Sequence, residues 1–182
     1  MRKLVDARLS SAPGRAPALA ALLLISLAPV AARDHADPTP GELRRLAIPV
    51  AGVARTDLRD TFDDGRPGHR HEAIDIAAPR GARVLAADDG KVVKLFSSIA
   101  GGLTVYQFDP ESRFAYYYAH LDRYADGVRE GMRLTRGDLI GYVGTTGNAA
   151  ANAPHLHFAV FRLGPERQWW KGEAINPFGA LH

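Results

Sequence analysis

The chain has 182 residues, of which 46% are hydrophobic and 24% charged, a composition typical of one globular domain with a short extension. It has no cysteine, which excludes disulfides, thiolate metal sites, iron–sulfur clusters and a cysteine nucleophile, so any metal site must use His, Asp or Glu. The net charge of +3 comes from residues 1–32; the other 150 residues hold 19 basic and 19 acidic side chains, so no nucleic-acid partner is expected.

Residues 1–32 have the pattern of an export leader. Four basic residues precede an uncharged run over residues 16–32, whose centre is AALLLISL and whose last residues are small. We expect an apolar leader helix that is either a secretory signal peptide or a retained N-terminal membrane anchor. Both interpretations predict an exported protein of the periplasm or cell envelope, which contacts a membrane only if the leader is retained.

Residues 33–45 are expected to form a linker, because residues 33–41 (RDHADPTPG) are polar and include two prolines, and one helical turn is expected over residues 42–46. The domain is expected over residues 46–182.

Beyond residue 46, short runs rich in β-branched and aromatic residues alternate with Gly, Asp, Asn and Pro. Their spacing of about ten residues, with short turns, predicts an antiparallel all-β sheet or sandwich. Turns at residues 88–90 and 109–112 should join neighbouring strands into hairpins. The strands are expected at residues 83–87, 91–96, 103–108, 113–120, 138–143 and 155–161.

The motif PHLHF places His155 and His157 two residues apart on an expected strand. Residues i and i+2 share a face of a strand, at about 6.5–7 Å along it, so both imidazoles can reach one centre. The alternative is two ordinary histidines on a half-exposed strand.

Asp75 lies in the apolar run AIDIAAP, where an isolated carboxylate would be costly to bury and a metal or cationic partner would remove that cost. In an extended strand His71 would be about 13 Å from Asp75, so a shared site requires a bend near residues 72–73. The alternative is an Asp that caps a turn or forms a surface ion pair. His69 lies in the loop-like segment GRPGHR and is expected to be exposed.

His120 ends the aromatic run FAYYYAH, where it can point into a cleft or belong to the core. Two histidines and one aspartate together suit Zn²⁺ and leave a fourth position open, which is the catalytic pattern. Two further histidines then remain for proton transfer.

The sequence resembles the lysostaphin/LytM-type peptidoglycan endopeptidases over about residues 46–178. The matching segments are HEAIDIAAPRGARVLAADDGKVV, YYYAHLDRY, RGDLIGYVGTTGNAAANAPHLHFAVF and EAINPF. The resemblance implies the LytM-like fold of duplicated-hybrid-motif type, with a groove over one zinc ion per chain. It implies hydrolysis of peptidoglycan stem or cross-bridge peptides by metal-activated water.

The resemblance also assigns residues. It implies His71, Asp75 and His157 as zinc ligands, and His120 and His155 as catalytic groups. The family usually has glycine at position 73, and Ala73 there is expected to adjust the bend, because alanine resists positive φ.

Three more residues are weaker candidates for substrate binding. Asn148 and Asn152 precede the His-x-His strand and can donate to a substrate backbone, or can be simple turn residues. Tyr118 can line the groove or pack in the core.

Two other functions are open. Some family members have lost ligands and only activate another wall hydrolase, so the domain can be an inactive one that binds wall peptide; the filled ligand set argues against this. A lipoyl-type β-barrel carrier or binding module is the second alternative, from the hairpin-like segment around residues 89–91, but it leaves five histidines unexplained.

Overall fold

The computed structural model describes residues 42–66 and 68–182. The expected leader helix and most of the expected linker lie outside these residues. Residues 42–45 have no regular structure and Leu46 forms an isolated bridge with Leu181, so the predicted helical turn at 42–46 is wrong. Among the described residues, none of the helices has the length and apolar character needed to cross a bilayer.

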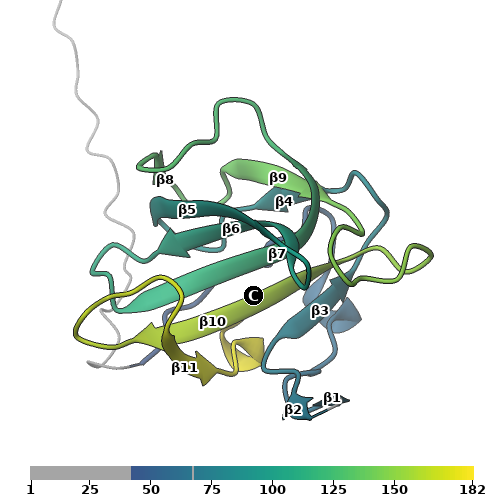
Figure 1. Ribbon diagram of the computed structural model, residues 1–182, viewed down its shortest axis with the longest axis horizontal. Coiled ribbons are helices and arrows are strands. Elements are labelled where there is room, and N and C mark those ends of the chain that lie inside the picture. The colour runs from purple at the N-terminus through teal and green to yellow at the C-terminus, as the bar shows by residue number, and fades with distance from the viewer. Residues whose placement is uncertain (1–41, 67) are drawn as a thin grey trace, which may run out of the picture. The chain divides into compact units, whose positions relative to one another are not determined.

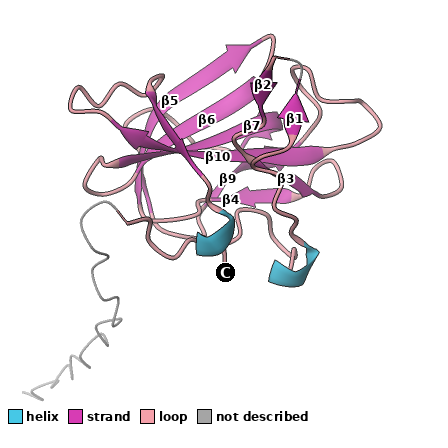
Figure 2. Cartoon of the chain, turned by 90° about the horizontal axis from the view of Figure 1, so that it is seen from below, coloured by secondary structure: helices cyan, strands magenta, loops and turns pink. Residues whose placement is uncertain are grey.

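The described chain is all-β, as predicted. Figure 2 shows the two short 3-10 turns, η1 (Arg55–Asp57) and η2 (Phe178–Ala180), as the helical segments of this part of the chain. The strands are β1 (Gly65–Arg66), β2 (His69–Arg70), β3 (Ile74–Ala77), β4 (Arg83–Leu85), β5 (Gly90–Ser98), β6 (Gly102–Phe108), β7 (Phe114–Tyr124), β8 (Arg133–Leu134), β9 (Leu139–Val143), β10 (His155–Leu163) and β11 (Gly172–Ile175).

Nine strands form one antiparallel sheet, in the order β11-β10-β7-β6-β5-β8 (Figure 1). β3 pairs with β10, and β9 pairs with both β7 and β4. β1 and β2 form a separate hairpin.

One predicted hairpin is confirmed and the other is wrong. The turn after β6 leads into β7, which pairs with β6, and the Asp109 carboxylate accepts hydrogen bonds from the backbone N–H groups of Arg113 and Phe114. The turn at residues 88–90 does not pair β4 with β5, because β4 pairs with β9 and β5 with β6 and β8. Asp88 is buried against Arg136 and the hydroxyl of Tyr116, so this segment enters the interior instead of forming a tight hairpin turn.

Strand β7 contributes side chains both to the core and to the face of the sheet that holds the candidate site. Its alternation buries Tyr116 and Tyr118 completely on the core side, together with Phe158 of β10, and leaves Tyr117 on the opposite face. Residues up to Ala119 pair with β10, and residues from Leu121 pair with β9. The residue between these two pairings is His120.

Candidate metal and catalytic site

Five predicted site residues line a single cavity of about 560 Å³ on the outer face of β7 and β10. They are His71, Asp75, His120, His155 and His157. Residues almost ninety positions apart meet there because β3 pairs with β10, which sets Asp75 directly opposite His157.

The bend predicted near residues 72–73 is present and lies at Glu72. Glu72 has φ of 55°, in the left-handed region that non-glycine residues seldom adopt, whereas Ala73 is outside that region and is completely buried. Alanine is therefore accommodated at position 73 without positive φ. The left-handed turn belongs to its neighbour, and Ala73 fills space as a small core residue.

Thr61 stabilises the bent segment, residues 71–75, through hydrogen bonds. Its hydroxyl donates to the carbonyl of Ala73 (3.1 Å) and accepts from the backbone N–H of Asp75 (3.0 Å). The carbonyl of Thr61 accepts from Nδ1 of His71 (2.9 Å). One residue therefore fixes both ends of the segment from His71 to Asp75.

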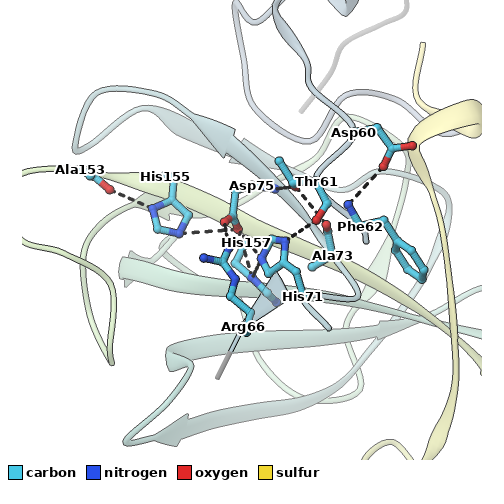
Figure 3. Close-up of polar contacts among 10 residues, drawn as sticks. All are labelled: Asp60, Thr61, Phe62, Arg66, His71, Ala73, Asp75, Ala153, His155 and His157. Carbon is cyan, nitrogen blue, oxygen red and sulfur yellow. Dashed lines mark hydrogen bonds and ion pairs between the residues drawn. The ribbon is translucent and has the colours of Figure 1, made fainter. Parts of the chain in front are cut away.

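Figure 3 shows the side chains of this cluster pointing toward one another. Oδ1 of Asp75 lies 3.0 Å from Nε2 of His71 and 3.1 Å from Nδ1 of His157, and the two nitrogens are 3.1 Å apart. Two histidine nitrogens and one carboxylate oxygen thus meet at one point.

The donor set fits a divalent cation. The bond to Thr61 places the His71 proton on Nδ1, so its Nε2 carries a lone pair and faces the carboxylate, which also only accepts. Either a proton on His157 or a cation must therefore lie between Nε2 of His71 and the Asp75 carboxylate. Tetrahedral Zn²⁺ bound at about 2.0–2.1 Å would separate its ligand atoms by roughly 3.3 Å, close to the spacing found here.

Electrostatics favour the metal-binding protonation states. Burial lowers the pKa of His71, which keeps its imidazole neutral at physiological pH. Burial alone would raise the pKa of Asp75, but a hydrogen bond from His157 and the electrostatic attraction of His157, His71 and His155 lower it to about 2. Asp75 is therefore a carboxylate at neutral pH, and its second oxygen accepts from Nη2 of Arg66 (2.9 Å).

His120 and His155 lie beside the cluster and form matching hydrogen bonds to backbone carbonyls. Nδ1 of His120 donates to the carbonyl of Thr146 (2.8 Å), and Nδ1 of His155 donates to that of Ala153 (2.8 Å). Each bond fixes the tautomer and leaves Nε2 as a base. Their rings are 5.0 Å apart, and burial lowers the pKa of His120, so that it is neutral at physiological pH.

A close contact between two loops positions His120. Its φ is 60°, and the carbonyl that it contacts belongs to Thr146, whose hydroxyl also donates to the carbonyl of Leu121 (2.7 Å). Gly102 (φ 63°) and Gly147 (φ 77°) allow this approach, since a Cβ on Gly102 would lie 2.2 Å from the Thr146 hydroxyl.

The three weaker candidates for substrate binding do not all lie in the cavity. Asn148 lines the cavity, whereas Asn152 is exposed and outside the lining. Of the two alternatives for Tyr118, packing in the core is the one observed, and a substrate-binding role is not supported: its ring is fully buried, and its hydroxyl donates to Gln107 and accepts from the N–H of Ala87. The strand alternation that buries Tyr118 turns Tyr117 into the cavity.

His69 is exposed, as predicted, and it also lines the cavity without belonging to the His–Asp–His cluster. Thr61, Arg66 and Thr146 were not found from the sequence. A single polar residue in a loop or in a two-residue strand carries no signal of a partner that is distant in sequence.

An antiparallel sheet with a His–Asp–His cluster and two further histidines in one cavity has the residues of a metal-dependent hydrolase. The sequence model of Peptidase family M23 matches residues 69–177, and the chain belongs to that family. The predicted resemblance to lysostaphin-type endopeptidases is thereby confirmed.

Individual relatives agree with this assignment. The L-Ala–D-Glu endopeptidase of Bacillus subtilis (strain 168) is 32% identical, over 70% of this chain and 41% of that protein. The murein hydrolase activator NlpD of Escherichia coli (strain K12) is 28% identical, over 67% of this chain and 28% of that protein. The chain therefore spans less than half the length of these relatives.

The fold is also similar to the catalytic domain of lysostaphin from Staphylococcus simulans, with a TM-score of 0.54 and 28% identity over 63% of this chain and 81% of that one. The lipoyl-type alternative is wrong, because the family and the nine-stranded sheet account for the hairpin-like segment that suggested it.

Proposed function

We propose that the chain is a zinc-dependent endopeptidase that hydrolyses peptide cross-links of bacterial peptidoglycan. One observation carries the proposal: three candidate ligand atoms of His71, Asp75 and His157 converge within 3.1 Å in a cavity that also holds the imidazoles of His120 and His155. Membership of Peptidase family M23 and similarity to a named endopeptidase support the same chemistry.

The substrate and the location follow from the same proposal. The proposed substrate is a stem or cross-bridge peptide of the wall, and the endopeptidase relative is named for the L-Ala–D-Glu peptide bond. Such a substrate lies outside the cytoplasm, which agrees with an exported protein whose residues 1–32 act as a signal peptide or an anchor.

In this mechanism His71, Asp75 and His157 would hold the zinc ion. A bound zinc supplies Lewis acidity, which polarises a carbonyl and lowers the pKa of water toward about 7. The carbonyl of Thr61 and the guanidinium of Arg66 hold His71 and Asp75 in position.

The two remaining imidazoles move protons. With Nδ1–H bound to a backbone carbonyl, Nε2 of His120 or His155 accepts a proton from the attacking water and passes it to the leaving amine. The other imidazole takes a proton from bulk water at Nε2 and from there donates a hydrogen bond to the oxyanion that develops on the scissile carbonyl. Tyr117 and Asn148 line the same cavity and are placed to contact a substrate backbone.

The test is digestion of purified peptidoglycan by the purified chain loaded with zinc, with mass analysis of the released muropeptides. We expect soluble fragments cut within the peptides and none from the His157→Ala variant or after chelation. Full hydrolysis by metal-stripped protein would overturn the proposal.

A second candidate is an activator of another wall hydrolase, which the similarity to NlpD favours. In the same assay an activator would release no fragments alone and would accelerate release by an added hydrolase. The complete set of ligands and imidazoles supports the enzyme over the activator.

A further inference from the structure

A ladder of aromatic rings leads away from the candidate site across the outer face of the sheet. Tyr117 lies 5.9 Å from His157, Tyr106 lies 4.6 Å from Tyr117, and Trp169 lies 4.8 Å from Tyr106, between ring centroids. Trp169 then contacts Phe96 (5.5 Å) and Trp170 (5.2 Å). We call the outer end, Phe96, Trp169 and Trp170, the aromatic platform.

Strand pairing explains why the rings share a face. Tyr106 on β6 is directly opposite Tyr117 on β7, and Lys94 on β5 is opposite Tyr106, which places Phe96 two residues further along the same face. The loop between β10 and β11 curls back over this face in Figure 1 and brings Trp169 onto it. The ladder is therefore built by the sheet and one loop together.

The outer end of the ladder is exposed. Large hydrophobic side chains that are exposed in the described part of the chain are Phe96 (41%), Ile99 (95%) and Trp170 (62%). Two belong to the aromatic platform, and Ile99 adjoins Ala100 and Gly101, which line the cavity. Single exposed apolar side chains are common on protein surfaces and need no explanation. Several of them grouped beside a site indicate a binding surface.

From these observations we infer that the aromatic platform is a subsite for the pyranose rings of the glycan strand. The inference rests on the proposed function. A wall peptide is attached to a glycan strand, so a cavity that takes the peptide must have sugar rings within a few residues of it. Flat, rigid aromatic faces stack on the C–H face of a pyranose, and tryptophan offers the largest such face.

Tryptophan fluorescence gives a direct test, because the chain contains only two tryptophans and both lie in the platform. The purified chain is titrated with peptide-free oligosaccharides of N-acetylglucosamine and N-acetylmuramic acid, and separately with a sugar-free stem peptide. We expect a saturable emission change with the oligosaccharide that is absent with the peptide. Because emission reports binding and not cleavage, failure of this test is distinct from failure of the hydrolysis assay.

Variants of the exposed ring make the test specific. Trp170→Ala should weaken the apparent Kd for the oligosaccharide about ten-fold, while Trp170→Phe, which keeps a ring, should change it less than about three-fold. Tyr142→Ala is the matched control, because this ring is on β9 and stacks on Arg123 outside the ladder.

Three results would overturn the inference. The first is an emission change with the sugar-free peptide and none with the oligosaccharide, which would make the platform a peptide subsite. The second is an emission shift with protein concentration alone, which would make it a contact between copies of the chain. The third is an unchanged Kd in Trp170→Ala.

Discussion

Replacing Thr61 with valine should loosen the candidate metal site without touching any residue that faces the metal. Valine matches the shape of threonine, so no cavity forms, but two hydrogen bonds are lost, to the carbonyl of Ala73 and from the N–H of Asp75. At about 0.5–1.5 kcal/mol each, the free energy of unfolding should fall by about 1–3 kcal/mol. Zinc affinity should fall about 10- to 100-fold, because groups that orient metal ligands have effects of this size.

The assay is urea unfolding of the metal-free chain, followed by zinc competition with a chelator. Thr61→Ser is the matched control, since it keeps the hydroxyl, and it should stay close to wild type in zinc affinity. If Thr61→Val unfolds within about 0.5 kcal/mol of wild type and binds zinc equally well, Thr61 does not hold this segment and the reasoning is refuted.

Three further predictions follow from the described side chains. Tyr118→Phe should lower stability by about 1–2 kcal/mol in urea unfolding, because a buried hydroxyl with two partners is lost, and should leave turnover within two-fold; a large loss of turnover would contradict its place in the core. Asp75→Ala should lose bound zinc, measured by elemental analysis, far more than His69→Ala, and equal losses would show that the ligands are assigned wrongly on this segment. The pKa of Asp75 is about 2 in the folded chain against 3.8 ordinarily, so the unfolded state binds the proton first, and metal-free protein should lose stability between about pH 4 and pH 2. Asp75→Asn should lose less over that range, and equal slopes would contradict the lowered pKa.

Local pattern was enough to predict the fold class and most strands. The expected strands at residues 103–108 and 138–143 match β6 and β9 within one residue at each end, because alternating apolar residues between turn-forming residues constrain both element and face. The partner of β4 was not predictable in this way. β4 pairs with β9, and the nearby contact between Asp88 and Arg136 joins residues 48 positions apart, so neither is contained in a local pattern.

The candidate site was also predictable from the sequence only in part. The need for a bend between His71 and Asp75 followed from strand geometry, and the structure confirms it at Glu72. Which tyrosine of the aromatic run enters the cavity did not follow, because the run is apolar on both faces and only the pairing with β10 decides which face is the core. The three hydrogen bonds of Thr61 depend on chain segments 10 to 14 residues apart and leave no trace in composition.

The central claim is that His157 holds the metal and His155 moves a proton, and it is tested by zinc content and turnover measured on the same preparations of His157→Ala and His155→Ala. His157→Ala should lose zinc and activity together, because its Nδ1 is one of the three converging atoms. His155→Ala should keep its zinc and lose about 10²–10⁴-fold in turnover, the usual size of an acid–base contribution. If His155→Ala empties the site while His157→Ala keeps its zinc, the assignment is reversed and the mechanism fails with it.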